Sequence, residues 1–167
     1  VQNGSDAVEL MKFTNTYKHP ELTVDLSTQI NANKTVAGPE DESLEYLLKK
    51  YQFRFEVIDL EGNPVLDADG NPMVGVTDEN GNITFPEFVF EMAGVYHYLI
   101  REQAAYEDRR ITTDDQIWCA HIQVIYDSAE GVLKIMPDGC ATHLYNPAVH
   151  NAEGGAEQAY ENPVFIN

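Results

Sequence analysis

Three polar residues stand at positions where the alternation of a β-strand predicts a side chain that faces a core. Between Leu22 and Val36, the even-numbered residues form a mostly apolar series that contains one lysine, Lys34. Glu102 is in phase with two tyrosines and an isoleucine, and Asn167 is in phase with Phe165. Because successive side chains of a strand point to opposite faces, all three residues are expected to point inward.

A lysine, a carboxylic acid and an asparagine held together in an apolar interior can form an amide bond. Burial disfavours the charged forms of an amine and of a carboxyl group, so both tend to be neutral. A neutral amine is a nucleophile, and a carboxyl group can polarise an amide carbonyl and carry protons. Fixed geometry contributes roughly 7–11 kcal/mol to such an intramolecular step. We therefore expect Lys34 to attack the side-chain carbonyl of Asn167 and expel ammonia, with Glu102 as the catalytic group.

Two other interpretations of these residues stay open at the level of sequence. Each residue could stand at a strand end and turn outward, because a charged side chain is rarely buried without a partner. Alternatively, Lys34 and Glu102 could form an ordinary ion pair beside the amide of Asn167. That pair would have to overcome several kcal/mol of desolvation per ion. Neither interpretation involves a covalent bond.

The elements expected to carry these residues are strands. Apolar and polar side chains alternate in Phe53–Ile58 and in Trp118–Tyr126, so each segment is predicted to be a strand with one buried face. A register that pairs Tyr126 with Leu133 across the turn at 127–131 brings the buried faces of two strands together. Further turns rich in Gly, Asn, Asp and Pro are expected at 61–64, 69–72 and 80–82.

Helical periodicity is confined to one segment, Asp41–Tyr51. Its three leucines share one face, and Asp41 or Ser43 could cap its N-terminus. The rest of the chain reads as strands separated by turns about every 8–12 residues, which indicates a sandwich or a barrel. The predicted fold class is therefore all-β with one short helix.

Composition limits the classes of function. The length of 167 residues suits one domain, and a hydrophobic fraction of 43% argues against disorder. The formal net charge of −18 disfavours binding to nucleic acid or anionic lipid. No run of about 18 apolar residues occurs, so no membrane insertion is expected. No cofactor-binding motif is found, and a hydrolase based on Glu102 would need a second in-phase acid that does not stand out.

The motif Phe-x-Asn occurs twice, at 13–15 and at 165–167, about one domain length apart. Two similar strand endings at that spacing suggest tandem domains. Residues 1–17 are therefore expected to be the terminal strand of a preceding domain or a linker, and residues 18–167 a β-sandwich domain. The chain begins without a start methionine or signal peptide, so it reads as a fragment of a longer protein.

Six segments of the chain together carry a resemblance to known domains. They are Asn-Lys-Thr-Val-Ala-Gly (33–38), the Phe-x-Phe strand (51–57), the central strands (81–90 and 93–102), the segment 111–118 and the terminal Phe-x-Asn (165–167). In this order they resemble the pilin isopeptide-linkage domains of Gram-positive surface proteins, relatives of the collagen-adhesin B-type domains. One segment, Ile-Thr-Thr-Asp (111–114), has Thr113 where the family usually has Tyr. The resemblance implies an immunoglobulin-like, collagen-adhesin B-type sandwich.

The resemblance also implies a function. In this family the lysine forms an isopeptide bond with the terminal asparagine, promoted by the acid, which maps to Lys34, Asn167 and Glu102. Asn15 would serve the bond of a neighbouring domain. The implied protein is an extracellular, cell-wall-anchored pilin or adhesin stalk that contacts neighbouring domains and reacts once, without turnover. The alternative is an adhesin domain that contacts a host molecule through the loop at 146–163, which is long for the family. Neither a sortase signal nor a clear pilin-linkage lysine motif is visible.

Two groups of residues resemble metal ligands, and each has a simpler interpretation. The acidic and amide residues at 67–71 and 78–82 resemble calcium ligands, but their glycines are misplaced for an EF-hand, so hairpin turns are predicted. Cys119, His121, Cys140 and His143 could suggest zinc. Cys140 and His143 lie three residues apart, on opposite faces of a strand, and the remaining histidines show no ligand spacing, so no metal site is predicted.

Cys119 and Cys140 have two open interpretations. The register that pairs Tyr126 with Leu133 places the two cysteines opposite each other if the ladder is uninterrupted. Opposed Cα atoms about 4.5 Å apart are near the lower limit for a disulfide. Against the disulfide, residues 137–139 (Pro-Asp-Gly) predict a bulge that shifts the register by one residue and leaves two free thiols on the outward face.

Overall fold

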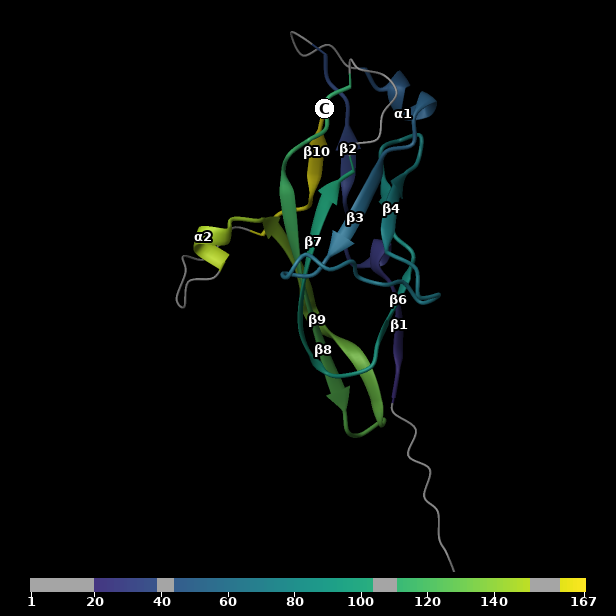
Figure 1. Ribbon diagram of the computed structural model, residues 1–167. Helices are drawn as coiled ribbons and strands as arrows, with labels where there is room; N and C mark the ends of the chain where they lie inside the picture. The colour runs from purple at the N-terminus through teal and green to yellow at the C-terminus, as the bar shows by residue number, and fades with distance from the viewer. Residues whose placement is uncertain (1–19, 39–43, 104–110, 151–159) are drawn as a thin grey trace, which may run out of the picture.

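The protein is an elongated β-structure. The computed structural model describes residues 20–38, 44–103, 111–150 and 160–167 (Figure 1). The beginning of the first strand and the C-terminal residue lie toward opposite ends of the body. The strands are β1 (Leu22–Asp25), β2 (Asn33–Thr35), β3 (Arg54–Ile58), β4 (Val74–Thr77), β5 (Ile83–Thr84), β6 (Glu87–Phe90), β7 (Gly94–Glu102), β8 (Ile117–Asp127), β9 (Val132–Leu144) and β10 (Val164–Ile166).

The strands form one large sheet and two small ones. The large sheet has six strands in the order β5-β4-β3-β7-β8-β9. The small sheets are an antiparallel pair of β1 with β6 and a parallel pair of β2 with β10. Buried residues from all three sheets belong to one hydrophobic core. The predicted all-β sandwich is therefore confirmed.

Aromatic side chains in this core anchor the short strand β10. Phe165 of β10 is fully buried, and its ring centroid lies 4.6 Å from that of Phe55 and 6.5 Å from that of Trp118. Full burial of a phenylalanine side chain contributes about 1.5–3 kcal/mol. A strand of three residues is thus held against the large sheet mainly by one ring.

The strand predictions agree with the structure at most positions. Phe53, Phe55 and Val57 are buried, and the predicted pairing of Tyr126 with Leu133 is present in the ladder between β8 and β9. The segment between Leu22 and Val36 is not one continuous strand. It is interrupted by a 3-10 helix, η1 (Leu26–Thr28), because the side chain of the preceding aspartate accepts a hydrogen bond from the Ser27 N–H and turns the chain.

Two short α-helices accompany the sheets in the described part of the chain. Helix α1 (Tyr46–Lys50) covers the second half of the predicted helical segment. Leu47 and Leu48 are buried, as their shared face predicts. Asp41 and Ser43, the predicted caps, lie outside the described residues. Helix α2 (Pro147–His150) forms a single turn after β9.

The disulfide interpretation of Cys119 and Cys140 is wrong, because both thiols are free in this structure. In the ladder of β8 with β9, Cys119 lies opposite His143, and Cys140 lies opposite Ile122. The reason is the bulge, which is larger than predicted: residues 136–139 of β9 face only Gln123 of β8. Nor does Cys119 lie on an outward, solvated face, because it is fully buried in a small second cluster.

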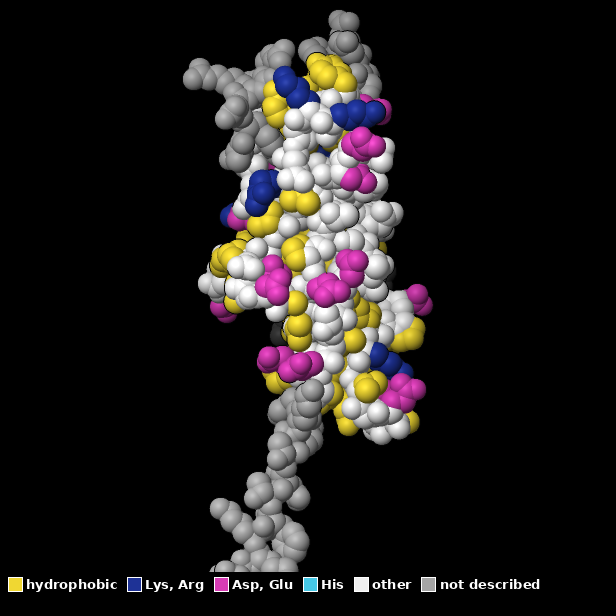
Figure 2. Space-filling view, turned by 90° about the vertical axis from the view of Figure 1, so that its right-hand side faces the viewer, with side chains coloured by type: hydrophobic (Ala, Val, Ile, Leu, Met, Phe, Trp, Pro, Cys, Tyr) yellow, Lys and Arg dark blue, Asp and Glu magenta, His cyan; other side chains and the backbone are white. Residues whose placement is uncertain are grey.

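Acidic side chains are spread along the length of the body on the face that Figure 2 shows. This distribution agrees with the net charge of −18, which repels anionic partners. Within the described residues, no helix is long and apolar enough to cross a membrane. The predictions for residues 1–17, Asn15 among them, fall outside the described residues, as do residues 151–159 of the long loop.

Candidate cross-link site

Lys34, Glu102 and Asn167, here called the cross-link site, meet in the interior. The Lys34 Nζ lies 3.0 Å from Glu102 Oε2 and 2.5 Å from Asn167 Oδ1. The Asn167 Nδ2 donates a hydrogen bond of 3.0 Å to the other carboxyl oxygen, Glu102 Oε1. Each of the three side chains therefore contacts the other two.

The parallel pairing of β2 with β10 brings Lys34 to Asn167. Phe165 is the register partner of Lys34, and backbone hydrogen bonds continue on both sides of this pair. The Asn167 N–H donates to the Thr35 carbonyl at 3.2 Å, and the Asn167 carbonyl accepts from Ala37 at 2.7 Å. The backbone of Asn167 is thus fixed on β2, which aims its side chain at the lysine.

A turn on the other side of β2 also holds the lysine. The Lys34 N–H donates to the Gly81 carbonyl at 2.7 Å. Gly81 has a φ of +85°, and a Cβ placed on it would overlap the backbone carbonyl oxygen of Lys34. Asp78 stabilises this turn by accepting hydrogen bonds from the backbone of Asn80 and Asn82. Glycine is needed here both for the positive φ and for the close approach.

Burial governs the electrostatics of the lysine. Lys34 is only 1% exposed, and its Nζ lies 5.4 Å from the centroid of the Phe53 ring. Desolvation lowers the pKa of Lys34 below 10.5, and the neighbouring carboxyl of Glu102 opposes this shift. Burial is the larger of the two effects, so the site favours the neutral, nucleophilic amine more than water does.

Asp114 is a residue of the site that the sequence analysis missed. Its backbone N–H donates to Glu102 Oε2 at 2.8 Å, and its own Oδ2 accepts from the Ile166 N–H at 2.7 Å. Asp114 thereby links the acid to β10, the strand that directly precedes Asn167. The segment 111–114, which carries part of the resemblance to the family, is the sequence signal that points to Asp114.

A comparison with protein families shows to which family the sequence belongs. The sequence matches the family described as the Spy0128-like isopeptide containing domain, FctA, over residues 30–163. The chain belongs to this family. The match includes Lys34, Glu102 and Asp114, and it ends shortly before Asn167.

One solved structure similar to this isopeptide domain is that of a mutant of the major pilin of Streptococcus pyogenes. The two share 13% sequence identity with a TM-score of 0.48, and the similarity covers 89% of this chain. The chain spans about half the length of that pilin, since 50% of the pilin chain is covered. No curated protein matches the sequence significantly.

The contacts of Glu102 in this isopeptide domain differ from the sequence expectation in one respect. We expected the acid to polarise the carbonyl oxygen of Asn167. Instead it accepts a hydrogen bond from the amide nitrogen, and the carbonyl oxygen is contacted by Lys34. One carboxyl oxygen thus faces the nucleophile and the other faces the leaving nitrogen, which is an arrangement suited to proton transfer.

Glu102 and Asp114 also line a surface pocket, together with residues of β3 and β8. The acidic residues at 67–71 and 78–82 of the isopeptide domain lie in turns, as predicted. Asp67 accepts hydrogen bonds from the backbone of Asp69 and Asn71, in the same pattern as Asp78. These carboxylates are already used to close the turns.

Proposed function

We propose that this domain is a structural module of a Gram-positive cell-surface pilus or adhesin stalk, strengthened by an amide bond between Lys34 and Asn167. The observation that carries the proposal is the buried contact of the Lys34 amine with both the Asn167 amide and the Glu102 carboxyl. The module is extracellular, and its partners are neighbouring domains of the same surface protein. Family membership supports this assignment.

The reaction conserves atoms and charge without a cofactor. The lone pair of Lys34 Nζ attacks Cγ of Asn167, and a proton of Nζ passes to Glu102. A proton from Glu102 then reaches Nδ2 of Asn167, the C–N bond breaks, and ammonia leaves. The acid is restored, and the product is a secondary amide that joins two side chains. The step happens once per chain, so the domain is not a turnover enzyme.

The surroundings favour this reaction in two ways. Phe53 and the rest of the core keep water from the amine, which would otherwise hold its proton. The pairing of β2 with β10 supplies the proximity, because the amine already lies 2.5 Å from the oxygen bonded to the target carbon. Positioning of this kind replaces an unfavourable bimolecular encounter.

The intact mass of the purified domain tests the proposal. The wild-type mass should be lower than that of the sequence by one ammonia, and a protease digest should contain the Lys34 and Asn167 peptides joined. Glu102→Gln should keep the fold and the full mass, because the amide cannot carry the proton. Glu56→Gln is the matched control, since Glu56 forms a surface ion pair with Arg101 and should not affect the bond.

A folded wild-type domain with the full sequence mass would rule the bond out. A bond that still forms in the Glu102→Gln variant would leave the cross-link standing but remove the proton-transfer role of the acid.

A further inference from the structure

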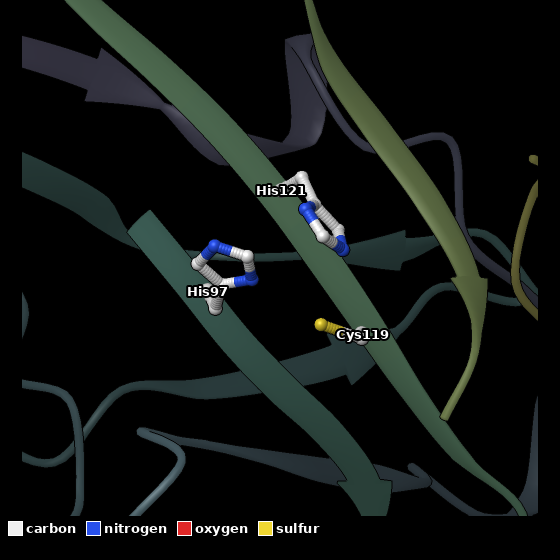
Figure 3. Close-up of side chains that lie close together, drawn as sticks. All are labelled: His97, Cys119 and His121. Carbon is white, nitrogen blue, oxygen red and sulfur yellow. The ribbon is translucent and has the colours of Figure 1, made fainter. Parts of the chain in front are cut away.

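A second cluster of reactive side chains lies on the face of the large sheet opposite the main core. His97 comes from β7, and Cys119 and His121 come from β8 (Figure 3). One ligand-capable atom from each residue lies within 4.8 Å of the others. Figure 3 shows the three side chains gathered around the same space between the two strands.

The sheet itself places these groups together. His97 is the register partner of His121, and Leu99 is the partner of Cys119. Because Cys119 and His121 are two residues apart on one strand, they face the same side. Both strands are interior to the six-stranded sheet, so the backbone beneath the cluster is held by ladders on both sides.

A chain of hydrogen bonds orients the imidazole of His121. The Nδ1 of His143 lies 2.9 Å from the carbonyl oxygen of Leu144, which can only accept, so this nitrogen carries the proton. In the neutral ring, Nε2 of His143 is then an acceptor, and it lies 2.7 Å from Nε2 of His121. His121 therefore donates from Nε2, and its Nδ1 carries a lone pair. Metal-binding histidines are oriented by such hydrogen bonds from the second ring nitrogen.

We propose that His97, Cys119 and His121 bind a Zn²⁺ ion, with His143 as the residue that orients His121. Two imidazole nitrogens and a thiolate form a ligand set that suits zinc and does not suit Mg²⁺ or Ca²⁺. Around a tetrahedral zinc ion, these ligand atoms lie about 3.3–3.6 Å apart, given bonds of about 2.0–2.3 Å. The present separations are at most 4.8 Å, so the side chains have to draw closer together when the ion binds. The fourth position is left for water.

Binding is a coordination step without redox change. The thiol of Cys119 releases its proton to solvent as the zinc–sulfur bond forms. The ion would join β7 to β8 across the outer face of the sheet. This site is separate from the cross-link and does not depend on it.

Spectroscopy with Co²⁺ tests the site on the full chain, produced without a histidine tag and freed of metal. We expect one Co²⁺ per chain, a sulfur-to-cobalt charge-transfer band and the intense visible bands of a tetrahedral ion. Added Zn²⁺ should displace the cobalt and abolish these bands. Absence of the thiolate band at saturating Co²⁺ would overturn the proposal.

Variants identify the ligands. Cys119→Ser should lose the sulfur-to-cobalt band, and His97→Gln should lose the intense visible bands of the tetrahedral ion. Cys140→Ser, the matched control, should keep both sets of bands. His143→Gln should keep the band and weaken zinc binding about 10–100-fold. If Cys119→Ser fails to fold, His97→Gln still decides, because His97 is only partly buried. Bands retained in the His97→Gln variant, or lost in the Cys140→Ser variant, would contradict the assignment.

Discussion

At the scale of single residues, Lys34 is subject to two opposing influences. Removal from water lowers the pKa of its amine, and the carboxyl of Glu102, 3.0 Å away, raises it. Because burial is the larger effect, an unreacted Lys34 makes stability depend on pH. Once an amide has formed, the nitrogen no longer titrates and this dependence disappears.

A variant that cannot form the bond should reveal the lowered pKa. Asn167→Ala should become more stable as the pH rises from the lowered pKa of folded Lys34 toward 10.5, the ordinary value. In that window the unfolded lysine holds a proton that the folded lysine has lost, so stability increases with pH. Thermal melts at a series of pH values measure the effect. The double variant Lys34→Met with Asn167→Ala is the control, and parallel curves for the two variants would contradict the prediction.

Asp114 should act as a positioning residue for the bond. Asp114→Ala removes the acceptor for the Ile166 N–H and should slow ammonia loss as newly synthesised chains fold, because β10 is held less firmly. Loss of a hydrogen bond to a charged group costs about 1.5–3 kcal/mol. Asp115→Ala, an exposed neighbour, is the matched control. Mass spectrometry over time measures both rates, and equal rates would remove Asp114 from the site.

At the scale of elements, two strands of three residues each position the reacting groups, because Lys34 lies in β2 and Asn167 directly follows β10. They are too short to be stable as an isolated pair. Their position depends on Phe165 in the core and on the turn that contacts the Lys34 backbone. The turn at 78–82 is therefore part of the site although none of its side chains reacts.

A comparison of two glycines in similar turns can distinguish support of the lysine from the ordinary conformational cost of alanine in a turn. Gly81 and Gly70 have φ values of +85° and +82°, so alanine at either position costs about 1–2 kcal/mol in backbone conformation. Only at Gly81 would the added Cβ overlap Lys34, because nothing lies within 4 Å at Gly70. Gly81→Ala should lower the melting temperature further than Gly70→Ala and slow bond formation, measured by melting curves and by mass. Equal effects would show that the turn does not support the lysine.

At the scale of the whole molecule, the proposed bond joins residues 133 positions apart. The first strand begins near one end of the body, and Asn167 lies toward the other (Figure 1). Tension applied at the two ends would pass from β1 and η1 to Lys34 and directly to Asn167. The sheet between these two residues would carry little of the load.

Loss of the bond should therefore lower stability strongly. In the chain-entropy account, a constraint across a loop of this length contributes about 5 kcal/mol, which corresponds to roughly 10–20 °C in melting temperature. Asn167→Ala should show this decrease and faster proteolysis, and Glu102→Gln should resemble it. Asn71→Ala, at an exposed turn, should melt like the wild type. Unchanged melting of Asn167→Ala would mean that no bond stabilises the domain.

The sequence by itself determined which side chains of several strands face the main core. Alternation has a period of two residues and depends only on the local chain, so the inward phase of Lys34, Glu102 and Asn167 could be predicted without a structure. The pairing of Tyr126 with Leu133 was predictable for the same reason, because a short turn connects the two strands.

Only the tertiary structure decided how distant segments meet. The contact of Lys34 with Asn167 depends on a parallel pairing of β2 with β10, which no local pattern encodes. The contacts of Asp114, Gly81 and His97 likewise join segments that are far apart in sequence or linked by long connections. The register that would place Cys119 opposite Cys140 does not occur, because several residues of β9 are accommodated in one bulge. The size of that bulge depends on packing against the neighbouring strand. Local periodicity specifies orientation, whereas register across long connections follows from the packing of the whole core.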